Sequence, residues 1–115
     1  MSLPKDAIVL KAYDLLKAAI LVINNFPRNA KFTLGDRLEN RLSDLLELYI
    51  QAYYAPAAEK RILLRQANVC LETLRYFFRL GFELGHYNST VYKTFAESLQ
   101  EIGRMTGGWL KSLGT

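Results

Sequence analysis

The feature that most constrains this chain is the recurrence of apolar residues every three or four positions, in separate stretches that cover most of its 115 residues. That spacing places apolar side chains on one face of an α-helix, whereas a half-buried strand would alternate at every second position. No stretch of the sequence alternates in that way. The chain is therefore predicted to be all-α, with helices over about residues 4–25, 34–54, 57–84 and 89–110.

The breaks between these stretches are short and rich in residues that end or begin helices. Thr33 stands where a cap for the second helix is expected, and Pro56 leaves room for only a tight corner before the third. Residues 85–89 combine glycine with asparagine and serine, either of which can cap the fourth helix. Short connections make sequence neighbours antiparallel, so we predict one domain, residues 1–115, folded as an up-down-up-down four-helix bundle.

The first helix carries more apolar surface than one core contact requires. Its inward stripe is complete without Leu10, Tyr13 and Leu21, which lie off that face at helical spacing. A helix with apolar residues outside its core stripe is expected to bury them in a second contact. This surplus predicts self-association of the protein.

Composition excludes several classes of protein. Half of the residues are apolar and the mean hydropathy is near zero, which is typical of a soluble globular chain. No apolar run approaches the roughly 18 residues that span a bilayer, so no membrane contact is predicted. The first residues lack the apolar region and cleavage site of a signal peptide, and a cytoplasmic location is expected. Cys70 is the single cysteine, so no intrachain disulfide can form, and its place on an apolar face predicts a buried thiol.

The residue pattern argues against catalysis. Nucleophilic catalysis needs a base beside the nucleophile, and the one histidine, His86, lies in a turn distant in sequence from Cys70. A di-iron bundle needs inward glutamates and a Glu-x-x-His repeat, and neither spacing occurs. A glycine-rich phosphate loop with Gly-Lys-Ser/Thr is also missing. We therefore expect no enzyme activity, no catalytic residue, no metal site and no cofactor.

The distribution of charged residues indicates a candidate binding surface. The chain has a net charge of +4, and the third predicted helix carries four arginines within about 80° of one another at 100° per residue. Those residues are Arg61, Arg65, Arg75 and Arg79. A row of guanidinium groups suits a phosphate backbone. The alternative is an ordinary solvated face on which Glu72 pairs with Arg75 three residues away.

The link between the first two helices is the most distinctive motif, FPRNAKFTLGDRL over residues 26–38. Phe26 and Phe32 are expected to pack on the bundle and leave Arg28 and Lys31 projecting as second candidate contacts. The motif resembles the accessory variability determinant (Avd) proteins of diversity-generating retroelements and the related proteins of ribosomal intervening sequences. The likeness continues through residues 37–41 and 45–50, which favours the Avd branch.

The resemblance implies a non-catalytic accessory protein that binds a reverse transcriptase and nucleic acid, as template RNA or complementary DNA. It also implies a homo-oligomer, a ring-like pentamer of four-helix bundles with a basic surface. The arginine row is inferred from spacing and lies outside the matched motif. The alternative is a structural or protein-binding four-helix bundle of the ribosomal intervening-sequence type, without nucleic-acid binding.

Overall fold

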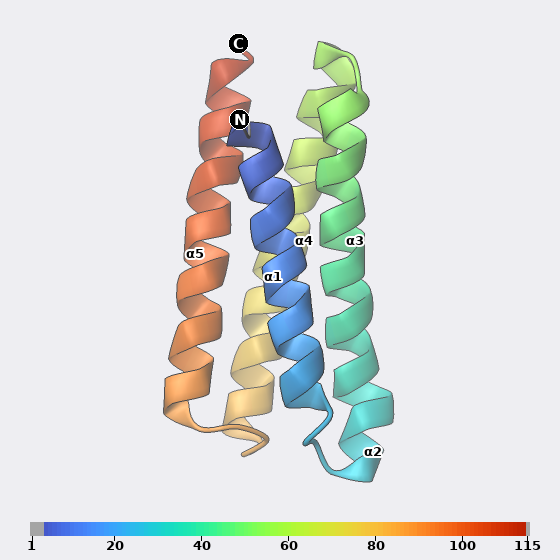
Figure 1. Ribbon diagram of the computed structural model, residues 1–115, viewed down its shortest axis with the longest axis vertical. Coiled ribbons are helices and arrows are strands. Elements are labelled where there is room, and N and C mark those ends of the chain that lie inside the picture. The colour runs from blue at the N-terminus through green and yellow to red at the C-terminus, as the bar shows by residue number, and fades with distance from the viewer. Residues whose placement is uncertain (1–3, 115) are drawn as a thin grey trace.

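The computed structural model describes residues 4–114, with side chains from residue 7 onward. Its long helices are α1 (Pro4–Ile23), α3 (Asp36–Tyr54), α4 (Ala57–Glu83) and α5 (Ser89–Ser112), and the described residues form no strand. Each long helix runs antiparallel to the next, and they pack in the cyclic order α1, α3, α4, α5 (Figure 1). The predicted all-α, up-down-up-down four-helix bundle is confirmed.

The link between α1 and α3 is more helical than predicted. Pro27 precedes a single helical turn, α2 (Arg28–Ala30), which widens into a π-helical turn, η1 (Lys31–Gly35), and runs on into α3. The prediction that the second helix starts after Thr33 is wrong. The Thr33 hydroxyl donates to the carbonyl of Asn29, 2.9 Å away and four residues back, as threonines inside helices often do.

The core is an apolar column that runs the length of the 44 Å bundle. Each long helix contributes an apolar stripe to this column, and on α4 Leu64 is fully buried. One polar contact lies within this column. The buried hydroxyls of Tyr49 and Thr106 are 2.7 Å apart, which joins α3 to α5 across the bundle.

The helix ends near the corners have satisfied backbone groups. Lys60, at the start of α4, donates to the carbonyls of Ala52 and Tyr53 at the end of α3, 2.7 and 3.0 Å away. At the start of α5, the Asn88 side chain accepts from the amide of Val91 at 2.9 Å. These contacts hold the corners that set the antiparallel arrangement.

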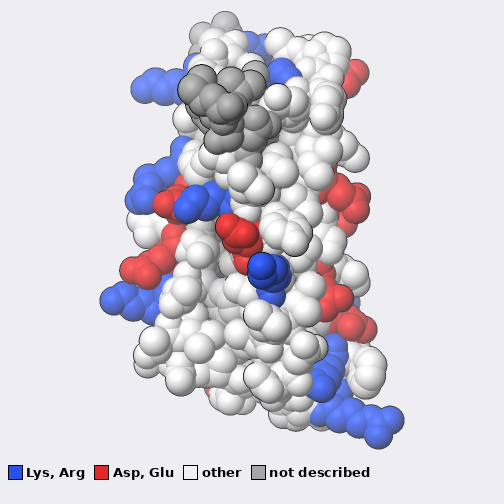
Figure 2. All heavy atoms as spheres, in the orientation of Figure 1, with Lys and Arg blue, Asp and Glu red and all other residues white. Residues whose placement is uncertain are grey.

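The outward face of α1 keeps the apolar surplus seen in the sequence. Leu10, Tyr13 and Leu21 are 55%, 50% and 61% exposed. The space-filling view toward α1 shows broad uncharged areas broken by a few charged side chains (Figure 2). Within residues 4–114, no helix combines the length and the apolarity that crossing a bilayer requires.

Candidate nucleic-acid interface

The arginine row predicted from spacing lies on α4, along the side of that helix that borders α5. Leu64, Leu71 and Leu74 are buried in the core, and the arginines lie beside this buried side of α4, toward α5. The row from residue 61 to residue 79 extends over about 27 Å at 1.5 Å per residue. It therefore follows most of the bundle's length.

The first member of the row has a structural role. The Arg61 guanidinium donates to the carbonyls of Leu113 and Gly114 at 2.6 and 3.0 Å. These carbonyls follow the last turn of α5, where a cation satisfies unpaired acceptors and the negative end of the helix dipole. Arg61 thus joins the start of α4 to the end of α5 and is the least available arginine of the row.

Two further arginines form exposed ion pairs. Arg75 meets Glu72 at 2.9 Å, and Arg79 meets Glu83 at 2.9 Å. The hydrogen bond that Arg79 donates to Glu83, together with the negative charge of Glu83, raises the pKa of Arg79. Exposed pairs of this kind are weak because water and salt screen them, so a phosphate could replace either carboxylate. Arg65 has no side-chain partner among the described residues and is the most available cation of the row.

A glycine on α5 leaves room for one of these side chains. A Cβ added at Gly103 would lie 3.0 Å from an Arg75 guanidinium nitrogen. The Arg75 side chain therefore extends from α4 across the surface of α5. The missing side chain at Gly103 thus makes room for the guanidinium of Arg75.

The structure adds a second row of cations that the sequence prediction missed. Lys93, Arg104 and Lys111 are exposed on α5, and their separations of 11 and 7 residues place them within about 20° of one another. They lie roughly a quarter turn from Gly103, on the side of α5 away from the core. Their helical spacing was the available signal. In Figure 2, blue side chains follow the α5 edge of the molecule with red ones between them.

Charge is segregated onto this surface, which we call the α4–α5 face. It comprises the α4 and α5 cation rows and the four carboxylates among them, which are Glu72, Glu83, Glu97 and Glu101. Seven cations against four carboxylates leave a surplus of three positive charges. The rest of the chain then has 15 minus 7, or eight, cations and 11 minus 4, or seven, carboxylates. Three of the four net positive charges therefore lie on the α4–α5 face.

The second pair of predicted contacts lies elsewhere. Arg28 is exposed on α2 and Lys31 is half-buried on η1, at the end of the bundle where α1 finishes and α3 begins. Phe26 is buried, as predicted, and its ring centre lies 4.9 Å from that of His86. Phe32 was expected to pack in the same way but is 68% exposed. The two aromatics of the link thus have different environments.

The residues considered for other chemistry remain apart. The Cys70 thiol donates to the Arg41 carbonyl at 3.2 Å, and burial raises its pKa to about 11, which makes it a poor nucleophile at neutral pH. His86 packs on Phe26 beyond the end of α4. No three histidine, cysteine, aspartate or glutamate side chains within the described part of the chain gather closely enough to hold a metal ion.

Comparison with known proteins assigns the family. No curated protein and no solved structure matches the chain significantly. The model of the bAvd-like family matches residues 7–113, nearly the whole chain. The match includes all four long helices of the bundle, the predicted FPRNAKFTLGDRL link and the α4–α5 face. This chain therefore belongs to the bAvd-like family.

Proposed function

We propose that this protein is a non-catalytic accessory protein of a diversity-generating retroelement, which binds a reverse transcriptase together with its template RNA or complementary DNA. The observation that carries the proposal is the placement of three of the four net positive charges on the α4–α5 face of a bAvd-like chain. A phosphate backbone binds such a surface by releasing its counterions, without any need for a catalytic group. The accessory role follows the family likeness.

The cations of the α4–α5 face differ in how readily they can bind phosphate. Among the described residues, Arg65, Lys93 and Arg104 have no side-chain hydrogen bond or ion pair to give up, whereas Arg75 and Arg79 would each exchange a weak carboxylate pair for phosphate. Arg61 would have to leave the end of α5. We therefore place the phosphate contacts first at Arg65 and Arg104. Arg28 and Lys31, at the end of the bundle, are proposed as secondary contacts.

Assembly would enlarge this surface. The exposed apolar residues of α1, Leu10, Tyr13 and Leu21, face away from the core and gain by burial against another copy. Copies arranged around an axis repeat the α4–α5 face, and the fields of the copies add. A ring-like pentamer in the cytoplasm is the assembly that the Avd resemblance implies, and we propose it here.

Salt-dependent binding tests the nucleic-acid contact. Binding of the intact protein to a labelled single-stranded RNA, and to DNA of the same sequence, is measured over a series of salt concentrations. Affinity should fall as salt rises, and Arg65→Ala and Arg104→Ala should each make the logarithmic salt slope shallower by about 0.7 per lost contact. Arg41→Ala is the matched control, because it removes an equal charge from α3 and outside the α4–α5 face.

Two outcomes would contradict the proposal. Absence of RNA and DNA binding at low salt removes the nucleic-acid role, and equal losses in Arg41→Ala and Arg65→Ala remove the assignment to the α4–α5 face. Co-purification with a reverse transcriptase from the same genome tests the partner. Failure to recover that polymerase with the intact protein would overturn the accessory role.

One observation favours the second candidate, a structural or protein-binding bundle without nucleic-acid binding. Three of the four α4 arginines already have partners within the chain. If those bonds are the purpose of the row, replacing Glu72 with glutamine should leave RNA affinity unchanged. If the row binds phosphate, Glu72→Gln should increase RNA affinity, because it frees Arg75 and removes a negative charge.

A further inference from the structure

The outward side of α1 carries four exposed residues in a symmetrical order. A leucine stands at each end of the line, and an acid and a base lie between the two leucines. The four residues recur at steps of four, three and four, and they are Leu10, Asp14, Lys17 and Leu21. At 100° per residue they lie within about 60° of one another, opposite the core stripe. We call these residues the α1 line.

The α1 line is not used by the bundle itself. Ala12, Leu15 and Ala19 fill the core side of α1, and the two leucines of the line are more than half exposed. The acid and the base of the line form no ion pair within the described part of the chain, whereas Lys11 beside them pairs with Glu101 of α5 at 2.8 Å. Figure 2, which views the molecule toward α1, shows acidic and basic side chains meeting on a largely uncharged face.

A two-fold axis through the middle of the α1 line makes the line complementary to itself. Its midpoint lies between residues 15 and 16, and the two leucines are equally far from it, as are the acid and the base. Two copies of α1 laid antiparallel across this axis place Leu10 against Leu21 of the partner subunit. They also place Asp14 against Lys17 of the partner subunit. Each contact then occurs twice, because a two-fold contact joins the same surface of both copies.

We infer that two copies of this protein associate through an antiparallel contact between their α1 lines. Burial of the leucines favours association, and the central charges fix the direction and the register. A parallel pair would place acid against acid and base against base. Sliding one helix by three residues in either direction would likewise bring two aspartates or two lysines together. This pairing requires neither nucleic acid nor a reverse transcriptase, and so it goes beyond the proposed function.

The contact is small. The α1 line extends over about 17 Å at 1.5 Å per residue, and a single helix pair of that length buries less than the roughly 800 Å² per partner of a standard interface. Pairing is therefore expected to be weak and to depend on protein concentration. It also differs from a ring contact, because a ring joins two different surfaces of each copy whereas this contact uses one surface twice.

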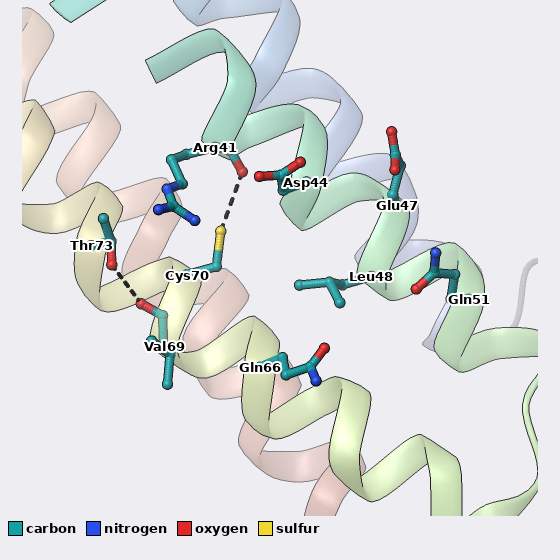
Figure 3. Close-up of a pocket in the computed structure, with 9 residues that line it drawn as sticks. All are labelled: Arg41, Asp44, Glu47, Leu48, Gln51, Gln66, Val69, Cys70 and Thr73. Atoms are coloured by element: carbon teal, nitrogen blue, oxygen red, sulfur yellow. Dashed lines mark hydrogen bonds between the residues drawn. The ribbon is translucent and has the colours of Figure 1, made fainter. Parts of the chain in front are cut away.

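A hollow of about 370 Å³ between α3 and α4 is the other surface that α1 of a second copy could meet. Figure 3 shows Arg41 and Asp44 on the α3 side of this hollow and Val69 on the α4 side. Laid antiparallel to α4, the α1 line would match both of these charges in sign. A rotation that reverses the long axis of the bundle is always a half-turn, so two different surfaces joined in that direction repeat without closing.

The opposite direction does not match the charges. With α1 parallel to α4, Asp14 precedes Lys17 along the hollow in the same order as Asp44 precedes Arg41. The two pairs of charges then align only with acid against acid and base against base. The two-fold pair of α1 lines is the arrangement that both matches opposite charges and closes at two copies.

Charge reversal with a compensating exchange tests the pair. Sedimentation equilibrium of the intact protein measures the dissociation constant of the step that doubles the mass of the particle. Asp14→Lys and Lys17→Asp should each weaken this step by at least about tenfold, because the two-fold axis turns two attractions into two repulsions. The double variant exchanges the acid and the base at unchanged net charge, so it should restore the unmodified value to within about threefold. Arg41→Asp is the matched control, since it makes the same charge change in the hollow and should leave pairing unchanged.

Disulfide formation between two variants reports the direction of the pair. Leu10→Cys and Leu21→Cys are prepared as separate proteins, and the buried Cys70 does not compete with them. A mixture of the two variants should form an interchain disulfide on oxidation, because residue 10 of one copy faces residue 21 of the other. Neither variant should do so by itself. A parallel pair would instead cross-link each variant with its own copies.

Three results would overturn the inference. A particle whose mass stays constant up to about 1 mM protein removes the pair. Failure of the double variant to restore pairing removes the contact between acid and base, and equal losses in Arg41→Asp and Lys17→Asp place α1 in the hollow instead. Circular dichroism of each variant checks that the bundle is intact, since all substituted side chains are exposed. RNA and polymerase binding decide the proposed function separately, so a protein that pairs but binds neither keeps this inference and loses that function.

Discussion

The buried contact between Tyr49 and Thr106 supports a quantitative prediction about how the bundle is held together. Both residues are fully buried, and their hydroxyl oxygens are 2.7 Å apart. The Thr106 hydroxyl also lies 2.8 Å from the carbonyl of Ile102, which can only accept. Since a hydroxyl has one proton, Thr106 donates to Ile102 and Tyr49 donates to Thr106.

This direction of donation makes the two single substitutions unequal. In Tyr49→Phe, Thr106 keeps its bond to Ile102, and the protein loses one hydrogen bond, at a cost of about 1 kcal/mol. In Thr106→Val, the Tyr49 hydroxyl stays buried with a proton and no acceptor among the described residues, at a cost of about 1–3 kcal/mol. We expect a cost of about 2 kcal/mol for Thr106→Val, which makes it the more destabilising of the two single substitutions.

The double variant is the decisive protein. With both hydroxyls removed, no buried donor is left without an acceptor, so Thr106→Val in the Tyr49→Phe background should cost less than about 0.5 kcal/mol. The two changes should therefore be non-additive by about 1–2 kcal/mol. Burial, the largest influence, raises the pKa of Tyr49, so the phenol remains a donor at neutral pH.

Urea unfolding followed by circular dichroism measures each free energy at neutral pH and constant protein concentration. Unchanged slopes against urea would show that the variants unfold from the same state. Additive costs, or a Tyr49→Phe cost above that of Thr106→Val, would refute the assigned donor and the role of this contact.

Three further predictions concern other parts of the fold. Gly81→Ala should destabilise the protein by about 1–3 kcal/mol in urea unfolding, because the added Cβ would lie 2.7 Å from the Tyr87 hydroxyl oxygen. Gly107→Ala is the control, because a Cβ at that position meets nothing within 4 Å, and it should not destabilise the protein. Burial raises the pKa of Cys70 to about 11, so at pH 8 its alkylation should be about a hundredfold slower than that of a cysteine with a pKa of 9, and urea should equalise the rates. As the pH rises, the Cys70 thiol ionises in the unfolded chain before it does in the folded protein. Its contribution to the free energy of unfolding is therefore intact below pH 9 and is lost as the pH rises toward 11. Cys70→Ala should reduce this loss of stability at alkaline pH. The hydrogen bond that Lys11 donates to Glu101 lowers the pKa of this exposed carboxyl, so Glu101→Gln should leave the midpoint of urea unfolding at neutral pH nearly unchanged, and a marked shift of that midpoint would contradict the assigned weak pair.

The sequence determined the helical bundle because each long helix carries its own periodic apolar stripe. The core residues Ala12, Leu38, Leu74 and Leu99 could be assigned from spacing alone, and all four are buried. The link was predicted less well, since Thr33 is a good capping residue in isolation. Local pattern cannot show that its hydroxyl will instead bond to Asn29 within a π-helical turn.

Part of the candidate site could be predicted from the spacing of residues within one helix. The arginine row belongs to one helix, so helical spacing was sufficient to find it, and it could have revealed Lys93, Arg104 and Lys111 as well. Spacing within one helix could not show which cations are available. Arg61 is occupied by carbonyls 52 and 53 residues away.

Relations between helices were decided by tertiary structure. The sequence by itself determined which side of each helix is apolar and which side is charged, because those patterns repeat with the helical turn. Only the packing of α4 between α3 and α5 decided that its arginines border α5 while Val69 and Thr73 border a hollow shared with α3. The physical reason is that such a surface joins side chains from different helices, whose relative rotation is set by how their apolar faces fit together.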